Sequence, residues 1–346
     1  MIKIDDHINV NLDNLAEQHY INRIGVPNAD GINYHSTASL IGRIRTQRAA
    51  DLATPDPTRV SFWDFLLDNN FANLKRIVVS RPNVLKTMIT EIEQICGLAF
   101  FSVDQNYDSA TLTDFGKVVK KVFNYRIYRD GVECSDNYNQ LDLCYCPYCN
   151  EQVIQVIVNV NGLNGESERR ALLQLDHFYP QSRHPYFAVS FFNMIPGCAT
   201  CNAQLKGEKK FDIDSHFNPF NKRLDDFFRF ELDSFLLLTQ NDVVINCKNI
   251  LNYSTNALDD FQILQRYNQN VSHKRMVFYL IQSFKNHSNK INRSIAQQLN
   301  GLFTTESKRK VLLEKYNVPI KQNEISQIQL GKLKRDIVIQ MGVLNP

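Results

Sequence analysis

The sequence lacks the features that would assign it to a membrane or to a secretory pathway. Its 346 residues contain no run of about eighteen apolar residues, so we expect no helix that spans a bilayer. The first residues, MIKIDDHINVNLDN, show no basic segment followed by an apolar one, so no secretory signal is expected. The sequence therefore predicts a cytoplasmic protein with no membrane partner.

A strong charge of one sign is also missing. The formal net charge is +3, from 39 basic and 36 acidic residues, so the overall balance does not indicate binding to nucleic acid, and any basic surface must be local. The sequence contains no glycine-rich P-loop of the form G-x-x-x-x-G-K-[ST], which excludes a nucleotide hydrolase of that type. Apolar residues make up 43% of the chain, enough for buried cores in two or three domains.

The patterning divides the chain into three parts. Residues 1–140 predict a helical module, with one helix through SLIGRIRTQRAADL capped by Ser36 and another through NVLKTMITEIEQICGL. Residues 141–222 contain short strands. Residues 223–346 return to helical patterning, as in HKRMVFYLIQSF, NRSIAQQLNGLF and ESKRKVLLEKY. The predicted fold class is α+β, a mainly helical chain with a small central unit of strands and helix.

A β-hairpin is predicted in the central part. The run QVIQVIVNV is rich in β-branched residues and alternates, and ALLQLDH follows after Asn-Gly pairs at Asn161 and Asn164. Apolar runs on both sides of an Asn-Gly-rich turn are typical of an antiparallel hairpin.

Four of the eight cysteines form two C-x-x-C pairs, Cys146 with Cys149 and Cys198 with Cys201. In a reducing compartment this spacing favours metal binding over disulfides. Tetrahedral zinc takes four thiolate ligands, which the two pairs can supply if the intervening hairpin brings them together. The alternatives are two unrelated buried pairs, or a redox motif at CPYC. A redox motif opens a helix after a strand, whereas this one precedes a strand.

Asp176 and His177 end the second predicted strand. A carboxylate here can hold a hard divalent cation, which prefers oxygen ligands. The neighbouring imidazole can take a proton from water near neutral pH. A twist at the strand end is needed to bring both side chains toward one substrate. By itself, an Asp-His pair is more often an ordinary surface pair.

Two asparagines and a lysine accompany this pair. Asn202 directly follows the last cysteine, on the expected first turn of a short helix, where its carbonyl oxygen can face a cation held by Asp176. Lys206 lies four residues later on the same helical face and can contact a phosphate. Taken alone, Asn193 and Asn202 are typical turn or cap residues.

Together these residues resemble a known family. The stretches CPYCN, DHFYPQSRHPYFAVSFFNMIP and CATCNAQLKGEKK are similar to the HNH endonuclease motif of the ββα-metal superfamily. More narrowly, they resemble the HNH nuclease subunit of Septu-type and retron-linked anti-phage defence systems of bacteria, and the likeness includes FNPF from Phe217. The likeness covers Cys146 to Phe220 and weakens toward the C-terminus. The first hundred residues resemble no family that we can name.

The resemblance implies a zinc-braced ββα-metal nuclease unit at residues 141–222. His177 would be the general base that activates water, and Asp176 and Asn202 would hold one catalytic Mg²⁺ or Mn²⁺. Asn193 would hold the loop opposite the base and orient His177 through its backbone, and the four paired cysteines would bind a structural zinc. Asn202 stands where many family members have a histidine, which favours magnesium because both protein ligands are then oxygens.

The resemblance also implies partners. The substrate would be nucleic acid, with DNA expected, and Arg183, Lys206 and Lys209 flank the motif where they can bind phosphates. Because this chain has no P-loop, any nucleotide hydrolysis must come from another subunit. We expect an ATPase of the same defence system to dock on the flanking helices.

Two alternatives remain open. The same motif can cleave RNA, for example a tRNA, because the chemistry acts on the phosphodiester and not on the sugar. The chain can also be a zinc-ribbon module that binds nucleic acid without cutting it. A module that only binds has no need for Asp176, His177 and Asn202 at these spacings.

Overall fold

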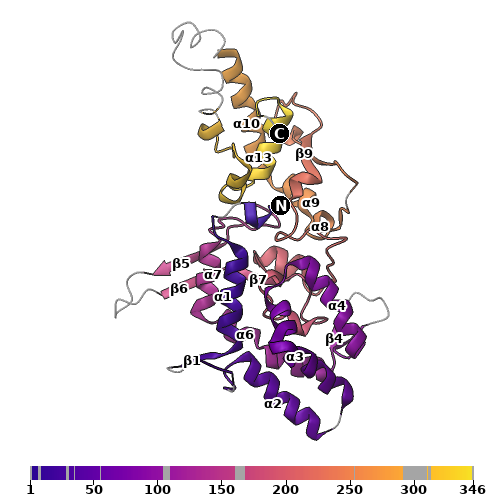
Figure 1. Cartoon of the computed structure of the whole chain (residues 1–346). Coiled ribbons are helices and arrows are strands. Elements are labelled where there is room, and N and C mark those ends of the chain that lie inside the picture. Colours follow the sequence, from indigo (N-terminus) through magenta and orange to yellow (C-terminus); the bar gives the residue numbers. More distant parts are fainter. Residues whose placement is uncertain are drawn as a thin grey trace. The chain divides into compact units, whose positions relative to one another are not determined.

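Helices and five small sheets make up the described chain. Each of these sheets pairs two antiparallel strands, so the α+β class is confirmed at this level. Within the described ranges no helix is both long enough and apolar enough to cross a bilayer. The computed structural model (Figure 1) describes residues 2–6, 9–28, 31–34, 36–54, 56–103, 110–159, 168–252, 254–290, 310 and 313–344.

The chain forms two compact units, and each is assembled from separate stretches of sequence. The N-terminal unit comprises Asn9–Asp142 and Gln155–Asn221. The C-terminal unit comprises Met1–Ile8, Leu143–Ile154 and Lys222–Pro346. The sequence predicts three consecutive domains, whereas the structure has two compact units, each of which is discontinuous in sequence.

Several helices of the N-terminal unit begin at polar caps. Side-chain oxygens of Asn11, Ser39, Asp56 and Thr113 each accept a hydrogen bond from a first-turn backbone N–H. The predicted cap at Ser36 is wrong, because Ser39 caps that helix. The helices are α1 (Leu12–Ile24), α2 (Leu40–Ala53), α3 (Pro57–Val79, interrupted at 68–71), α4 (Pro82–Cys96), α5 (Asp114–Phe123), α6 (Tyr125–Arg129) and α7 (Val132–Gln140).

Aromatic side chains fill the core of this unit. The ring of Phe62 lies 5.0 Å, centroid to centroid, from the rings of both Trp63 and Phe100. Tyr186, on the 3-10 helix η2 (Pro185–Phe187), packs against Phe100 at 5.1 Å. Edge-to-face rings at these distances add to the free energy gained from burial. The segment that follows the Asp-His motif therefore shares one core with the N-terminal helices, which explains why the two do not form separate compact units.

The predicted hairpin is confirmed in its two arms, β5 (Gln155–Asn159) and β6 (Glu168–Leu172), which pair antiparallel (Figure 1). Its Asn-Gly turn lies outside the described residues. The prediction that ALLQLDH forms one strand is wrong, because Leu173 separates β6 from β7 (Gln174–His177). The other strands of the unit are β1 (Val26–Asn28), β2 (Gly31–Asn33), β3 (Phe101–Val103), β4 (Ala110–Leu112) and β8 (Met194–Gly197).

Strand β7 pairs with β8, so the Asp-His motif lies beside the segment that leads to the second cysteine pair. In this register Asp176 is opposite Ile195 and His177 is opposite Met194. The 3-10 helix η3 (Phe191–Asn193) precedes β8, and a short π-helix, η4 (Thr200–Lys206), follows it. The order is strand, strand, short helix.

The C-terminal unit contains a second hairpin, which the helical patterning of this region does not predict. Strand β9 (Phe228–Leu232) pairs with β10 (Ile245–Asn249), so the purely helical pattern expected after residue 223 is wrong. Helix α13 (Gly331–Gln340) packs along β9 (Figure 1). The remaining elements are η1 (Ile4–Asp6), η5 (Leu224–Asp226), η6 (Gln240–Asp242), α8 (Asn256–Asp260), α9 (Ile263–Gln269), α10 (Val271–Lys290) and η8 (Gln322–Gln327). The predicted helix NRSIAQQLNGLF and part of ESKRKVLLEKY lie outside the described residues.

Candidate metal centre and active site

The two C-x-x-C pairs come together. The Sγ atoms of Cys146, Cys149, Cys198 and Cys201 all lie within 4.8 Å of one another, and all four side chains are buried. Within the described part of the chain this is the only group of three or more histidine, cysteine or acidic residues arranged to hold a metal ion. Four thiolates around one zinc ion are separated by about 3.8 Å, given a Zn–S bond of about 2.3 Å. The cluster can therefore hold a structural metal such as zinc.

The turn around the first pair is shaped by Asn150. Its backbone N donates to the carbonyl of Cys146 at 2.7 Å, and its φ of 50° is left-handed, a conformation that asparagine tolerates. Its side-chain amide donates to the carbonyl of Ile325 at 2.9 Å and accepts from the backbone N of Lys332 at 3.0 Å. The first C-x-x-C turn is thus held by the C-terminal part of the chain.

Asp176 forms a buried ion pair with Lys206. The carboxylate Oδ1 lies 2.8 Å from the Lys206 Nζ, and each side chain is about 1% exposed. The ammonium group also donates to the backbone carbonyl of His177 at 2.8 Å. A buried carboxylate without a compensating charge is strongly destabilising. Lys206 therefore compensates Asp176 inside the fold, whereas its place in the motif predicts contact with a phosphate.

The π-helix η4 lies along one face of β7. Residues two apart on a strand share a face, so Gln174 and Asp176 point the same way. The side-chain amide of Asn202 donates to Gln174 Oε1 at 3.0 Å, and Lys206 reaches Asp176. The Gly207 N–H donates to the Asn202 carbonyl at 2.8 Å, five residues back, which is the hydrogen bond of a π-turn. Such turns are frequent at functional sites.

The imidazole of His177 is held by a backbone carbonyl. Its Nε2 lies 2.9 Å from the carbonyl oxygen of Ala188. A carbonyl only accepts, so Nε2 carries the proton and Nδ1 is left with a lone pair. The amide nitrogen of Gln181 lies 2.8 Å from Nε2 and 3.2 Å from Nδ1, and in this tautomer only Nδ1 can accept from it. The ring of Tyr125 packs edge-on at 4.7 Å.

The charge state of His177 follows from its surroundings. Burial lowers the pKa of the imidazole to about 4, the Ala188 carbonyl and Asp176 oppose this, and Lys206 adds to it. The ring is therefore neutral at pH 7. A neutral imidazole with a fixed tautomer can accept a proton at Nδ1.

Asn193 fixes the segment that follows His177. Its Oδ1 accepts from the backbone N of Tyr179 at 2.8 Å, and its Nδ2 donates to the carbonyl of Tyr179 at 3.1 Å. Its own carbonyl accepts from the backbone N of Phe178 at 2.9 Å. Asn193 therefore fixes the backbone of the two residues that follow His177.

His19 on α1 makes contacts that no motif in the sequence predicts. Its side chain is fully buried, with Nε2 2.9 Å from the carbonyl of Val189 and Nδ1 2.9 Å from Glu133. Val189 follows Ala188, whose carbonyl holds His177. No local signal identifies His19, because its partners lie more than a hundred residues away in sequence.

The two other predicted phosphate-binding residues differ in exposure. Arg183 is only 4% exposed, and its guanidinium lies over the ring of Phe101 at 5.5 Å. Lys209 is exposed, beyond the end of η4. The structure therefore does not gather Arg183, Lys206 and Lys209 into one exposed basic patch.

Comparison with models of known protein families, with curated proteins and with solved structures finds no match for this chain.

Proposed function

We propose that this chain is a metal-dependent HNH-type endonuclease that hydrolyses phosphodiester bonds, with DNA as its substrate. The observation that carries the proposal is the state of His177. The Ala188 carbonyl accepts from Nε2 and so fixes the tautomer, which leaves the Nδ1 lone pair as the group that would accept a proton. The adjacent Asp176, the order β7, β8, η4 and the clamp made by Asn193 support the same assignment.

Under this proposal the catalytic magnesium ion would have few protein ligands. Asp176 and Asn202 would hold it through oxygen atoms, and magnesium commonly keeps several waters and takes the rest of its ligands from substrate phosphates. One oxygen of Asp176 is already paired with Lys206. When bound, the cation would polarise a phosphate oxygen and offset the charge of the transition state.

The chain's own residues supply the proton transfer. His177 Nδ1 accepts a proton from the attacking water as its oxygen forms a bond to phosphorus. The bond from phosphorus to the 3′ oxygen breaks, and the leaving 3′ oxyanion takes a proton from solvent water, which gives a 5′ phosphate and a 3′ hydroxyl. Lys206 pairs with the Asp176 carboxylate inside the fold, and Asn193 keeps the His177–Tyr179 segment in place.

Cleavage of plasmid DNA and of total RNA, each with and without magnesium, tests the proposal. We expect magnesium-dependent cleavage of plasmid that falls by at least about a hundredfold in His177→Ala and Asn202→Ala. Gln204→Ala, an exposed position on η4, is the matched control and should cleave like the unmodified protein. Zinc content and the far-UV spectrum establish that each variant is folded.

The other outcomes discriminate the alternatives. Cleavage of RNA alone would assign the same chemistry to an RNA substrate. Retention of nucleic acid with no cleavage under any condition would make the chain a zinc-ribbon binding module. Full activity of His177→Ala would remove His177 from the mechanism.

The proposed partner is an ATPase subunit, with anti-phage defence as the setting. The support is the likeness of the Cys146–Phe220 stretch to nuclease subunits of such systems and the absence of a P-loop from this sequence. Co-expression with an ATPase encoded beside the gene should yield a stable complex on size-exclusion chromatography. Separate elution of the two proteins would contradict the partnership.

A further inference from the structure

Two of the three basic side chains that the motif predicts to bind phosphate are buried. Lys206 is paired with Asp176 inside the fold, and Arg183 is 4% exposed and lies over the ring of Phe101. A surface that binds the phosphates of a substrate at His177 must therefore include residues from outside the motif.

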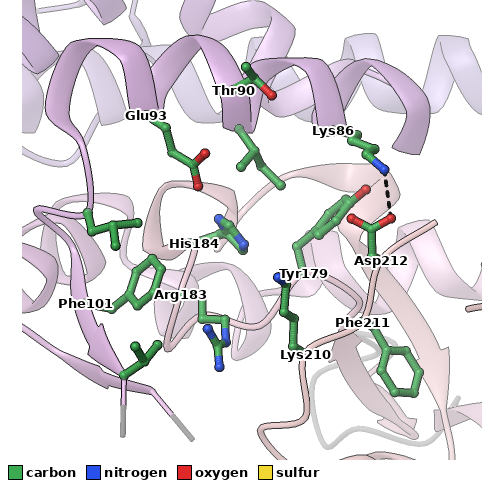
Figure 2. Close-up of a pocket in the computed structure, with 13 residues that line it drawn as sticks. Lys86, Thr90, Glu93, Phe101, Tyr179, Arg183, His184, Lys210, Phe211 and Asp212 are labelled. Carbon is green, nitrogen blue, oxygen red and sulfur yellow. Dashed lines mark hydrogen bonds and ion pairs between the residues drawn. The ribbon is translucent and has the colours of Figure 1, made fainter. Parts of the chain in front are cut away.

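The cavity of about 370 Å³ shown in Figure 2 does not include the candidate base. Its Lys86 is already compensated, because the Nζ lies 2.9 Å from Asp212 and also contacts Asp214. Figure 2 shows the Lys86–Asp212 pair on one side of the cavity. His177 is not among the residues that line this cavity, so the surface around the candidate base is formed by other elements.

Helix α6 is attached to the strand that carries His177. The ring of Tyr125, the first residue of α6, packs edge-on against the His177 imidazole, with the ring centroids 4.7 Å apart. One turn later, the Arg129 guanidinium donates to the carbonyl of Leu173 at 2.8 Å, and Leu173 directly precedes β7. These two contacts hold the start of α6, and with it the end of α5, beside the candidate base.

Helix α5 has one face in the core and one face in solvent. Val119 and Val122 are buried, and the helix packs against η2. Lys117, Lys120 and Lys121 are exposed on the remaining surface. Residues three and four apart lie on the same side of a helix, so Lys117 is a neighbour of both other lysines. The solvent face of α5 is therefore basic.

Two of these lysines are not compensated by any residue that the structure describes. The Nζ of Lys117 lies 3.0 Å from Asp114, three residues earlier on the same helix. Lys120 and Lys121 make no ion pair within the described ranges. The last turn of α5 therefore presents two positive charges to solvent.

The charge of Lys120 acts on the candidate base. Burial lowers the pKa of His177 to about 4, the Ala188 carbonyl and Asp176 oppose this, and the charges of Lys206 and Lys120 lower it further. Lys206 is buried, whereas Lys120 is exposed. Of these two cations, Lys120 is the one that a substrate can reach.

A nucleic acid bound at His177 extends beyond the bond that is cut. Each strand of a DNA duplex carries one phosphate about every 3.4 Å along the helix axis, so the phosphates on either side of the scissile one lie over neighbouring protein surface. The lysine ammonium group is a compact charge that binds a phosphate without reading the base.

We propose that Lys120 and Lys121, at the end of α5, bind the phosphates of duplex DNA that flank the bond cut at His177. This inference rests on the proposed nuclease function and adds a substrate-binding surface to it. Since the contacts are to the backbone, binding through them is independent of base sequence.

Fluorescence anisotropy of a labelled DNA duplex with the full chain, without added magnesium, measures binding in the absence of cleavage. We expect Lys120→Ala/Lys121→Ala to weaken binding by at least about tenfold at about 0.1 M salt. The slope of log K against log salt concentration should fall by about two in this double variant and by about one in each single variant, because each phosphate contact contributes about 0.9.

Lys248→Ala is the matched control for each single variant. It removes an exposed lysine of β10, in the C-terminal unit, and should leave both the affinity and the salt slope unchanged. All of these variants alter exposed side chains, and thermal unfolding establishes that each one is folded.

The inference is overturned if the unmodified chain does not bind duplex DNA, or if the double variant binds with unchanged affinity and salt slope. An equal loss in Lys248→Ala would also overturn it, since the effect would then come from net charge alone. The two proposals fail separately. An inactive protein whose DNA binding depends on both lysines contradicts only the nuclease assignment. A magnesium-dependent nuclease that binds DNA equally well without them contradicts only this inference.

Discussion

At the scale of single residues, the Asp176–Lys206 pair is the largest departure from what the sequence suggests. Lysine is among the residues that are least often fully buried, so Lys206 was expected at the surface. The structure buries it because the strand that carries Asp176 and the helix that carries Lys206 pack face to face. That packing brings together residues thirty positions apart, which no local pattern encodes.

Removal of Lys206 should destabilise the fold more than a typical surface change. Lys206→Met leaves the Asp176 carboxylate buried without its cation, which costs roughly 3–5 kcal/mol in comparable sites. Urea unfolding measures the change in the free energy of unfolding. Lys209→Met, an exposed lysine three residues later, is the matched control and should change it by less than about 0.5 kcal/mol.

The double variant Asp176→Asn/Lys206→Met should recover part of the lost stability, because neither remaining side chain is charged. Residues in direct contact give such non-additive effects. A Lys206→Met protein as stable as the unmodified one would show that the pair is not buried in solution.

The pKa of His177 predicts an unusual pH dependence of cleavage. A general base must be deprotonated, and burial lowers the pKa of this imidazole from its usual 6.5 to about 4. The fraction of neutral His177 therefore stays near one from pH 8 down to about pH 5 and falls only below that. We expect kcat/KM to show no loss attributable to this group near pH 6.5.

Single-turnover cleavage rates between about pH 4 and pH 8 measure this profile, with zinc content determined at each pH so that loss of metal is not mistaken for titration of the base. A half-maximal rate at about pH 6.5 would mean that the imidazole is solvated in the working enzyme.

At the scale of secondary-structure elements, local sequence patterns predicted the elements that depend on residues close together in the chain. The β5–β6 arms follow from alternation on both sides of Asn-Gly pairs, and α4 follows from its apolar spacing and from Pro82 in its first turn. The partner of β7 could not be predicted, because ALLQLDH reads as one uninterrupted strand. The β9–β10 pair was missed because β9 alternates over only five residues and β10 is largely polar.

The two cysteine turns were predictable from their spacing alone, and their contribution to the stability of the fold can be tested. A four-thiolate site binds zinc with a large free energy that is coupled to folding. We expect one zinc per chain, and we expect 1,10-phenanthroline or Cys198→Ser to lower the Tm by roughly 10 °C.

Cys247→Ser alters a cysteine of β10 that is outside the cluster and should retain both zinc and Tm. Metal analysis and differential scanning calorimetry provide the two measurements. If the protein freed of zinc has the same Tm as the untreated protein, the buried thiols do not stabilise the fold by binding metal.

At the scale of the whole molecule, the division of the chain differs from the linear order of its motifs. The motif stretch 141–222 contributes to both compact units, since Leu143–Ile154 belongs to one and Gln155–Asn221 to the other. Sequence patterning orders segments along the chain and carries no information on which of them share a core. The four-cysteine cluster could be predicted because each C-x-x-C pair is local in sequence, whereas the assembly of the two compact units from separate stretches could not.

This division predicts that residues 141–222 do not fold when expressed alone, although they hold the whole candidate active site. Strand β8 would lose the hydrogen bond from the Tyr138 hydroxyl to the Met194 carbonyl, together with the aromatic core around Phe62. The first cysteine turn would lose the contacts that Asn150 makes with Ile325 and Lys332. Such a fragment would expose large apolar surface and leave buried polar groups unsatisfied.

The ¹H–¹⁵N spectrum of the 141–222 fragment in the presence of zinc should show the narrow amide dispersion of an unfolded chain, whereas residues 1–346 should unfold cooperatively. A well-dispersed fragment spectrum would mean that residues 141–222 form an autonomous domain, and that the surrounding helices are not required for its folding.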